Sequence, residues 1–230
     1  MYSLIRRLAR RKRDDWHNAR ADLFVRLMQP AEGARILDLG GQDGSFMVRI
    51  RERVRVDVTV ADIGDAPNEA ARRHGFRAVI LEEGKPLPFE SEEFDIVFCN
   101  SVIEHVTLPK RDCIERRFAN SEWIAESLAS QTAFATELAR VGRGYFVQTP
   151  HRAFPIEAHT WLPAVGWLPH NATVSVVRIS DRVWVKQCGY VDWNLLDERQ
   201  MRDLFPGARI HVERVAGLPK SIVAYKRQGD

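Results

Sequence analysis

Residues 35–45 read RILDLGGQDGS, an apolar run with the carboxylate of Asp38 near its end, followed by a glycine-rich loop. Such a sequence is typical of a buried strand that leads into the ligand-binding turn of a nucleotide-binding sheet. A dinucleotide site requires the pattern GxGxxG, whose second glycine lets the pyrophosphate approach the backbone. Here Gln42 stands at that middle position between Gly40 and Gly44, so a pyrophosphate would meet a side chain. The loop therefore favours a ligand that brings no phosphate to it.

Two carboxylates indicate what that ligand carries. Asp62 lies 22 residues beyond Gly40, at the end of the strand-like segment VDVTVADI, where a carboxylate can accept both hydrogen bonds of a ribose diol. Asp38 stands just before the loop, where it can pair with a cationic amino group. S-adenosylmethionine carries both groups, whereas a nicotinamide dinucleotide lacks the amino group. We therefore predict S-adenosylmethionine rather than NAD as the ligand; the alternative is a plain β-turn with a surface aspartate.

Strand-like and helix-like segments alternate on both sides of this loop, which is typical of an α/β fold with helices on both faces of a parallel sheet. The expected strands are residues 34–39, 56–63, 76–81, 94–100 and 144–150. The expected helices are residues 15–29, 45–54, 66–75 and 121–140. Further on, Asp197 and Gln200 are spaced as a capping box for a short helix. Residues 209–215 and 221–227 then predict a closing antiparallel strand pair.

The positive charge of the chain is concentrated at its start. The net charge is +3, and residues 6–13 hold six of the 34 basic side chains, which leaves the remainder mildly acidic. Apolar residues are interspersed at roughly helical spacing, so residues 1–13 predict a basic helix that is either solvated or amphipathic and able to rest on an anionic membrane. Nucleic acid is a weaker expectation, because the run lacks interleaved aromatic side chains.

No run of 18 apolar residues and no secretion signal is found in this sequence. The three cysteines fit neither a disulfide framework nor a paired zinc motif. We therefore expect a cytoplasmic protein with reduced thiols. If the basic segment binds lipid, the protein is peripheral at the inner membrane surface.

Four motifs follow one another along the chain: ILDLGGQDG, VADI, PLPFESEEFDIVFCNSVIEHV and ELARVGRGYFVQTP. In order and spacing they resemble the class I S-adenosylmethionine-dependent methyltransferases, especially the broad type 11 group, over about residues 33–150. The resemblance implies a Rossmann-like sandwich with a mostly parallel seven-stranded sheet and a reversed terminal strand. It also implies methyl transfer from S-adenosylmethionine.

The resemblance assigns roles to a set of cofactor-binding residues. Asp38 would hold the methionine amino group and Asp62 the ribose hydroxyls, while the glycines allow close approach to the backbone. The full set is Asp38, Gly40, Gly41, Gly44, Asp62, Glu83, Asn100 and Ser101. Within it, Glu83 would contact the adenine amino group, and the last two residues would flank the methionine part. This sequence departs from the family pattern at Gln42, where glycine is usual, and at Glu83, where aspartate is commoner.

The length of 230 residues, 45% of them hydrophobic, suits one compact domain. We divide it into a basic helical segment (1–30), a cofactor-binding core (31–150), a lid on the acceptor side (151–195), and a helix with the closing strand pair of the same domain (196–230). The lid is expected to be ordered, because it is rich in proline and tryptophan.

A methyltransferase must align donor and acceptor and, for a hydroxyl acceptor, remove a proton. The loops after the fourth and fifth strands lie at the ligand crevice of such sheets. They supply the candidates Glu104, His105, His151, Glu157 and His159. His159 or His151 is the expected base and Glu157 orients one of them, while His105 either takes part or supports the backbone. Because His-x5-Glu-x-His is unlike a helical zinc pair, we predict no metal here; a converging loop site is the alternative.

The segment TPHRAFPIEAHTWLP also resembles type 11 members that act in cell-surface polysaccharide and glycolipid assembly. It favours O-methylation of a sugar hydroxyl or a lipid-linked glycan. One alternative is C- or O-methylation of a quinone-like small molecule. Another is a catalytically silent methyltransferase-like domain that binds a partner. Phe154, Trp161 and Trp167 suit stacking on sugar rings, or else form the core of the lid.

Overall fold

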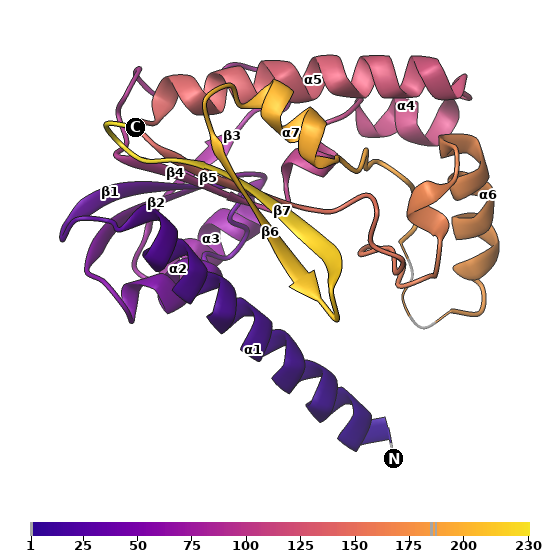
Figure 1. The fold of residues 1–230 in the computed structure, drawn as a ribbon, viewed down its shortest axis with the longest axis horizontal. Coiled ribbons are helices and arrows are strands. Elements are labelled where there is room, and N and C mark those ends of the chain that lie inside the picture. The colour runs from indigo at the N-terminus through magenta and orange to yellow at the C-terminus, as the bar shows by residue number, and fades with distance from the viewer. Residues whose placement is uncertain (1, 185, 187) are drawn as a thin grey trace. The chain divides into compact units, whose positions relative to one another are not determined.

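The computed structural model describes residues 2–184, 186 and 188–230, and their side chains from Asp14 onward. The chain forms two compact units, which are described one at a time. The first unit comprises Met1–Cys99, Arg140–Phe146 and Lys226–Asp230, and the second comprises Asn100–Ala139 and Val147–Tyr225. Figure 1 labels their helices and strands.

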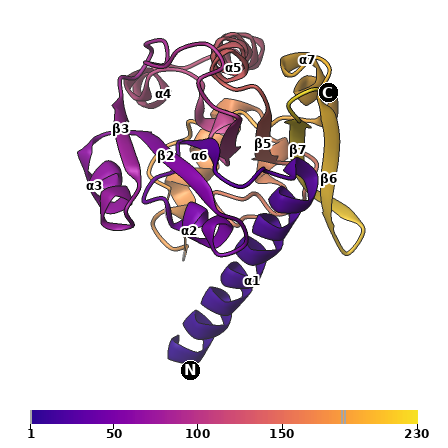
Figure 2. The same ribbon diagram turned by 90° about the vertical axis from the view of Figure 1, so that its left-hand side faces the viewer.

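The first unit contains the N-terminal part of the α/β alternation. Its elements are α1 (Tyr2–Met28), β1 (Ala34–Leu39), α2 (Ser45–Arg51), β2 (Val56–Ile63), α3 (Asp65–Arg73), β3 (Arg77–Leu81) and all but the last residue of β4 (Ile96–Asn100). Strand β1 pairs in parallel with β2 and β4, and β2 pairs in parallel with β3. Helix α3 lies beside β2 and β3, and α1 lies beside α2 (Figure 2).

A cluster of aromatic rings holds the helices of the first unit on its strands. The ring of Phe98 in β4 stacks on those of Phe46 and Phe146, with centroid distances of 4.9 and 5.4 Å. Phe24 of α1 meets Phe98 edge-on at 5.3 Å. Such pairs contribute about 0.5–1.5 kcal/mol each beyond their burial. Because Phe46 lies in the first turn of α2, the cluster also fixes the helix that follows the glycine loop.

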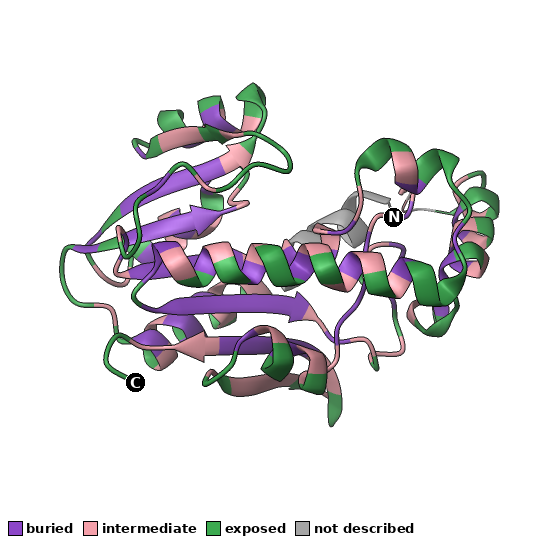
Figure 3. Cartoon of the chain, turned by 90° about the horizontal axis from the view of Figure 1, so that it is seen from above, coloured by how far each residue is buried: buried purple, intermediate pink, exposed green. Residues whose placement is uncertain are grey.

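The second unit contains most of the remaining elements. They are η1 (Ile103–His105), α4 (Lys110–Glu115), α5 (Asn120–Val141), β5 (Tyr145–Pro150), η2 (Val165–Trp167), α6 (His170–Ser180), α7 (Glu198–Leu204), β6 (Arg209–Val215) and β7 (Leu218–Lys226). Helix α5 buries about one residue per turn, namely Trp123, Ser127, Gln131, Ala135, Leu138 and Val141. Figure 3 shows this face as purple bands between pink and green ones.

The strands form a seven-stranded sheet with the order β3-β2-β1-β4-β5-β7-β6. The last two strands are antiparallel, with an irregularity between Glu213 and Arg214. The predicted mostly parallel, Rossmann-like α/β sheet with a reversed terminal strand is thereby confirmed. The capping box is confirmed too, because Gln200 N–H donates to Asp197 Oδ1 at 2.9 Å and Asp197 N–H donates to Gln200 Oε1 at 3.0 Å.

The two helical stretches predicted for residues 1–13 and 15–29 form one continuous helix where the chain is described. Helix α1 includes the predicted helix 15–29 apart from its last residue, and it extends back to Tyr2. The side chains of residues 1–13, on which the predicted basic amphipathic face depends, lie outside the described residues. Within the part of the chain that is described, no helix is both long enough and apolar enough to span a bilayer.

Candidate active site

The carboxylate of Asp38 is buried near the end of β1, and its Oδ2 has no hydrogen-bond partner. Burial, followed by repulsion from Asp62 and Asp43, raises the pKa of Asp38 to about 8. A buried polar atom without a partner is costly, and a cationic group beside Oδ2 would satisfy it and restore the charged form. Asp38 therefore has the properties of a site for an ammonium group.

The loop after β1 has an unusual backbone. Gly40 and Gly44 have φ angles of 73° and 70°, in the left-handed region that glycine adopts without strain. A Cβ atom at Gly41 would collide with the carboxylate of Asp38, so only glycine fits there. Gln42 has a φ of 49°, so a side chain occupies a left-handed position where the family pattern has glycine.

The carboxylate of Asp62 is oriented by two backbone N–H groups. Gln42 N–H donates to Oδ2 and Ile63 N–H donates to Oδ1, and each hydrogen bond is 2.7 Å long. Each carboxylate oxygen can accept two hydrogen bonds, so one lone pair on each remains for a vicinal diol. The buried side chain of Asn68 donates to the carbonyl oxygens of Asp62 and Gly64 and closes the turn after β2. The glycine loop and this turn together fix Asp62.

The other predicted cofactor residues are more scattered. Glu83 is exposed in the turn after β3 and belongs to the first unit, like Asp38 and Asp62. Asn100 ends β4 and Ser101 follows it, and both belong to the second unit. Ser101 has a φ of 56°, and its Oγ donates to a side-chain oxygen of buried Gln148 at 2.9 Å.

The residues of the first unit fit S-adenosylmethionine. Asp38 offers a partner for the amino group, and Asp62 offers two acceptors for the ribose diol. A pyrophosphate at the same loop would meet the negative charges of Asp43 and Asp62 and, once it ionises, of Asp38. The loop thus suits the methyl donor better than a dinucleotide.

Glu157 and His159 form a hydrogen-bonded pair in the second unit. His159 Nδ1 lies 2.6 Å from Glu157 Oε1, and the backbone N–H groups of His159 and Thr160 also donate to this carboxylate. Burial favours a raised pKa for Glu157, but these hydrogen bonds and the charge of the imidazole outweigh it and lower the pKa to about 2. The ionised carboxylate therefore fixes the ring and leaves Nε2 for a proton or a ligand.

Glu104 and His105 lie beside the same histidine. His159 Nε2 is 4.0 Å from Glu104 Oε1, and the two imidazole centroids are 4.7 Å apart. Thr149 Oγ1 donates to Glu104 Oε2 at 3.0 Å, whereas the buried Oε1 has no hydrogen-bond partner. Burial raises the pKa of Glu104. Although burial alone would lower the pKa of His105, the hydrogen bond of its Nδ1 to Asp192, 2.9 Å long, raises it.

Helix α5 holds the backbone around Glu104. The buried side chain of Gln131 donates to the carbonyl oxygens of Ile103 and Asn194, at 2.9 and 3.1 Å. Asn194 N–H in turn donates to the carbonyl oxygen of Glu104 at 2.8 Å. These hydrogen bonds explain why a polar residue, Gln131, lies on the buried face of α5.

His151 has other partners than the pair formed by Glu157 and His159. Its Nδ1 accepts a hydrogen bond from Ala153 N–H at 2.9 Å, and its Nε2 lies 4.0 Å from a carboxylate oxygen of Glu198. Burial lowers the pKa of His151. Of the predicted candidates, the structure thus brings together Glu104, His105, Glu157 and His159 and gives His151 a separate environment.

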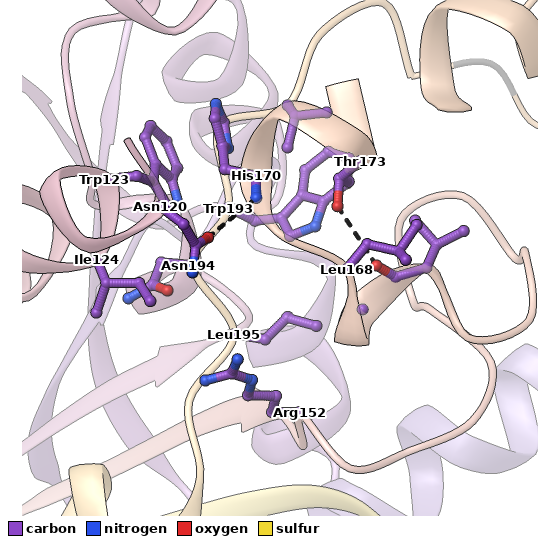
Figure 4. Close-up of a pocket in the computed structure, with 13 residues that line it drawn as sticks. Asn120, Trp123, Ile124, Arg152, Leu168, His170, Thr173, Trp193, Asn194 and Leu195 are labelled. Carbon is purple, nitrogen blue, oxygen red and sulfur yellow. Dashed lines mark hydrogen bonds between the residues drawn. The ribbon is translucent and has the colours of Figure 1, made fainter. Parts of the chain in front are cut away.

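An open pocket lies in the second unit, lined by side chains that include residues of α5, η2 and α6 (Figure 4). Its aromatic lining is Trp123, Trp193 and His170, and the rings of His170 and Trp123 stack with centroids 3.6 Å apart. Trp193 also stacks on His159 at 4.6 Å, so the cavity borders the catalytic candidates. Burial lowers the pKa of His170 to about 4, and its Nε2 has no hydrogen-bond partner. Polar side chains also line the cavity: Asn120, Arg152, Thr173 and Asn194.

The sequence patterns did not single out two residues of this region. Asp192 and Trp193 contact His105 and His159, but they stand in the segment YVDWN, which has no recognisable motif. Of the aromatic residues proposed for sugar stacking, Trp161 and Trp167 are 54% and 53% exposed and do not line the cavity.

Comparison with known proteins supports the cofactor assignment. A family model described as a methyltransferase domain, of the type 11 group, matches residues 37–116. This match includes the second half of β1, the glycine loop, β2 and the segment with Glu104 and His105. No curated protein sequence matches the chain.

Several solved structures share the fold at low identity. The N-terminal domain of EvdMO1, solved in the presence of SAH and D-fucose, is 16% identical with a TM-score of 0.55, and the match covers 92% of this chain and 82% of that one. The CurJ carbon methyltransferase is 16% identical with a TM-score of 0.50, and the match covers 87% and 50% of the two chains. A Rhodobacter sphaeroides protein named for zinc-dependent alcohol dehydrogenases is 12% identical with a TM-score of 0.57, covering 90% and 88%.

These likenesses show the fold, and the family model together with the donor residues distinguishes a methyltransferase from a dehydrogenase. The carboxylates and glycines of the first unit fall within the matched range of the family model. The family model thus supports the predicted methyltransferase with S-adenosylmethionine as its methyl donor. Over residues 37–116 the chain is therefore similar to the type 11 group of the class I S-adenosylmethionine-dependent methyltransferases.

Proposed function

We propose that this methyltransferase acts on a hydroxyl oxygen of a small acceptor, either a sugar or a glycolipid. The observation that carries the proposal is the pair of Glu157 and His159, in which a buried carboxylate holds a histidine with one ring nitrogen available. A hydroxyl is a weak nucleophile until its proton is removed. A fixed neutral imidazole is the usual group for that task near pH 7.

The roles divide between donor and acceptor residues. S-adenosylmethionine supplies a methyl carbon that the acceptor oxygen attacks in line, so that a C–O bond forms, the C–S bond breaks and S-adenosylhomocysteine leaves. Asp38 pairs with the donor amino group, and Asp62 accepts hydrogen bonds from the ribose hydroxyls. His159 takes the hydroxyl proton at Nε2, while Glu157 stays ionised and stabilises the imidazolium.

The order of the strands supports this division of roles. Strand β4 neighbours β1, and the chain reaches Glu104 four residues after β4 ends at Asn100. In open parallel sheets, ligands bind outside the carboxyl ends of the strands, where the strand order reverses. Asp38 is the penultimate residue of β1, and Glu104 lies beyond the end of β4.

The cavity of the second unit is the proposed acceptor site. Trp193 lines the cavity and stacks on His159, so an acceptor bound there is close to the proposed base. Aromatic faces suit the apolar faces of a sugar ring, and side-chain amides suit its hydroxyl groups. The unpartnered Nε2 of His170 offers one more polar contact. In agreement, the similar EvdMO1 domain was studied with a sugar, D-fucose.

Two alternatives are less well supported. A carbon or quinone-like acceptor has a precedent in the similar CurJ carbon methyltransferase, but the polar lining of the cavity favours an acceptor with several hydroxyl groups. A silent binding domain would not need a buried carboxylate with an unpartnered oxygen, as at Asp38, or one oriented by backbone N–H groups, as at Asp62.

The test of this proposal is a transfer assay with methyl-labelled S-adenosylmethionine and the full chain. Sugars, glycolipid extracts and quinones are offered separately, and calorimetry compares binding of S-adenosylhomocysteine with binding of NAD. We expect S-adenosylhomocysteine to bind, NAD not to bind, and label to enter a sugar or glycolipid as a methyl ether. Label only on a quinone carbon would contradict the proposed acceptor, and no labelled product from any fraction would favour the silent domain.

A second proposal concerns residues 1–13, whose six basic side chains we assign to peripheral contact with an anionic membrane. Each charge near such a surface contributes about 1 kcal/mol, and salt screens it. We expect vesicles rich in anionic lipid to bind the full chain at low salt and to release it at high salt. A variant with glutamine at the six positions should not bind. Equal binding of both proteins would leave the solvated helix as the correct interpretation.

A further inference from the structure

We propose that Glu104, His105 and His159 bind a divalent transition-metal ion of the zinc type. One donor atom from each of the three residues lies within 4.8 Å of the others. Two imidazoles and one carboxylate form a ligand set that zinc uses in catalytic sites with an open position. All three residues belong to the second unit. This set differs from the His151, Glu157 and His159 pattern, for which the spacing predicted no metal.

Both histidines already have the second contact that metal-bound histidines show. His159 Nδ1 is held by Glu157 at 2.6 Å, and His105 Nδ1 is held by Asp192 at 2.9 Å. A metal-ligating histidine nearly always donates its other N–H group to a carboxylate, a carbonyl or water, which fixes the ring and its tautomer. In each ring Nε2 is then the nitrogen available to an ion. Two neighbouring histidines, each hydrogen-bonded to its own carboxylate, form the arrangement that metal-binding histidines show.

Glu104 supplies an independent observation. The residue is fully buried, and Oε2 is satisfied by Thr149 while Oε1 has no hydrogen-bond partner. Oε1 lies 4.0 Å from His159 Nε2, too far for a hydrogen bond. A buried carboxylate oxygen without a partner is costly, and a cation between it and the two imidazoles would satisfy it.

The geometry requires a modest contraction on binding. Ligand atoms around a tetrahedral zinc ion, with bonds of about 2.0–2.2 Å, lie about 3.3–3.6 Å apart. The three donor atoms would therefore move together by about 1 Å. The side chain of His105 is 36% exposed, which gives an ion access from solvent and leaves room for an oxygen ligand.

The ion would also take part in the proposed methylation of a hydroxyl group. This part of the inference rests on the proposed function. An acceptor hydroxyl bound to the ion loses its proton to solvent more readily, and the resulting oxygen attacks the methyl group. In the zinc-bound protein, His159 is a metal ligand and not the base, because its Nε2 lone pair cannot bind the ion and a proton at the same time. In the metal-free protein the same nitrogen accepts the proton.

The test is titration of the full chain with zinc chloride by calorimetry in a non-chelating buffer. We expect one ion per chain and a loss of affinity of at least 100-fold in Glu104→Gln and in His105→Gln. Asp192→Asn, which removes only the anchor of His105, should weaken binding 10- to 100-fold. His151→Gln serves as the matched control and should bind as the parent does. Cys188→Ser tests whether a thiol beside the backbone of His159 is responsible instead.

The outcomes separate the metal site from the methyl transfer. Absence of saturable zinc binding, or binding lost only in Cys188→Ser, overturns the metal proposal. If methyl transfer to a hydroxyl nevertheless proceeds, the proposed function stands with His159 as the base. If zinc binds as expected but no hydroxyl is methylated, the metal site stands and the proposed function fails. Circular dichroism of each variant checks that weaker zinc binding is not caused by unfolding.

Discussion

The variant His159→Ala is expected to lose at least 100-fold in the rate of methyl transfer while it binds S-adenosylhomocysteine as tightly as the parent. General-base assistance is typically worth about 100- to 10,000-fold, and metal ligation of the acceptor oxygen is of similar importance. The residues proposed to bind the donor, Asp38 and Asp62, belong to the other unit and are unchanged in this variant. Initial rates at saturating donor, together with calorimetry, measure both quantities.

His151→Ala is the matched control, because it removes a buried histidine from the same segment. His151 Nδ1 accepts a hydrogen bond from Ala153 N–H, so removing the side chain should lower the free energy of unfolding. The activity per folded molecule should remain nearly intact. Retained activity in His159→Ala would show that this histidine is not the general base. Loss of activity in His151→Ala with normal stability would transfer that role to His151.

The second large effect is expected at Asp38. Replacing it by asparagine removes a charge-assisted hydrogen bond to the donor amino group, worth about 1.5–3 kcal/mol, and should weaken donor binding at least tenfold. Asp62→Ala should cost at least as much, because two hydrogen bonds to the ribose are lost. Asp57→Asn, an exposed aspartate at the other end of β2, is the control and should bind normally.

The pH dependence of binding distinguishes Asp38 from Asp62. Since the pKa of Asp38 is about 8 without ligand, its carboxyl is protonated at pH 6–7 and must lose the proton to pair with an ammonium group. Donor affinity should therefore rise with pH, by up to about tenfold per unit, until it levels off near pH 8, where the amino group also begins to deprotonate. Calorimetry at two pH values and in two buffers measures the affinity and the proton release. An Asp38→Asn protein with the same pH dependence would contradict the assignment.

The positions in the fold of the proposed donor residues could be predicted from sequence because they depend on short-range patterns. Asp38 and Asp62 each stand at the end of an apolar strand, and only one crossover helix separates the two strands. In such a unit the strand ends meet at one edge of the sheet, so position in the sequence determines position in the fold. The boundaries of β1 and β2 were predicted for the same reason.

The acceptor half could be predicted only in part, because its contacts join distant segments. His105 and Asp192 are 87 residues apart, and nothing in the sequence around Asp192 indicates this contact. The short helices α4 and α6 were not predicted, since α4 spans under two turns and α6 follows a stretch rich in proline and tryptophan. His151 and His159 looked equivalent in the sequence, and only the fold gives them different partners.

The most direct test of the account is a crystal structure of the full chain with S-adenosylhomocysteine bound. We predict that the amino group of the ligand lies within about 3 Å of Asp38 Oδ2 and that the ribose hydroxyls contact Asp62. We also predict that His159 Nε2 lies within about 8 Å of the sulfur, which leaves room for the acceptor atom and one hydrogen bond. A ligand bound away from these carboxylates, or a sulfur well beyond that distance from His159, would contradict the account.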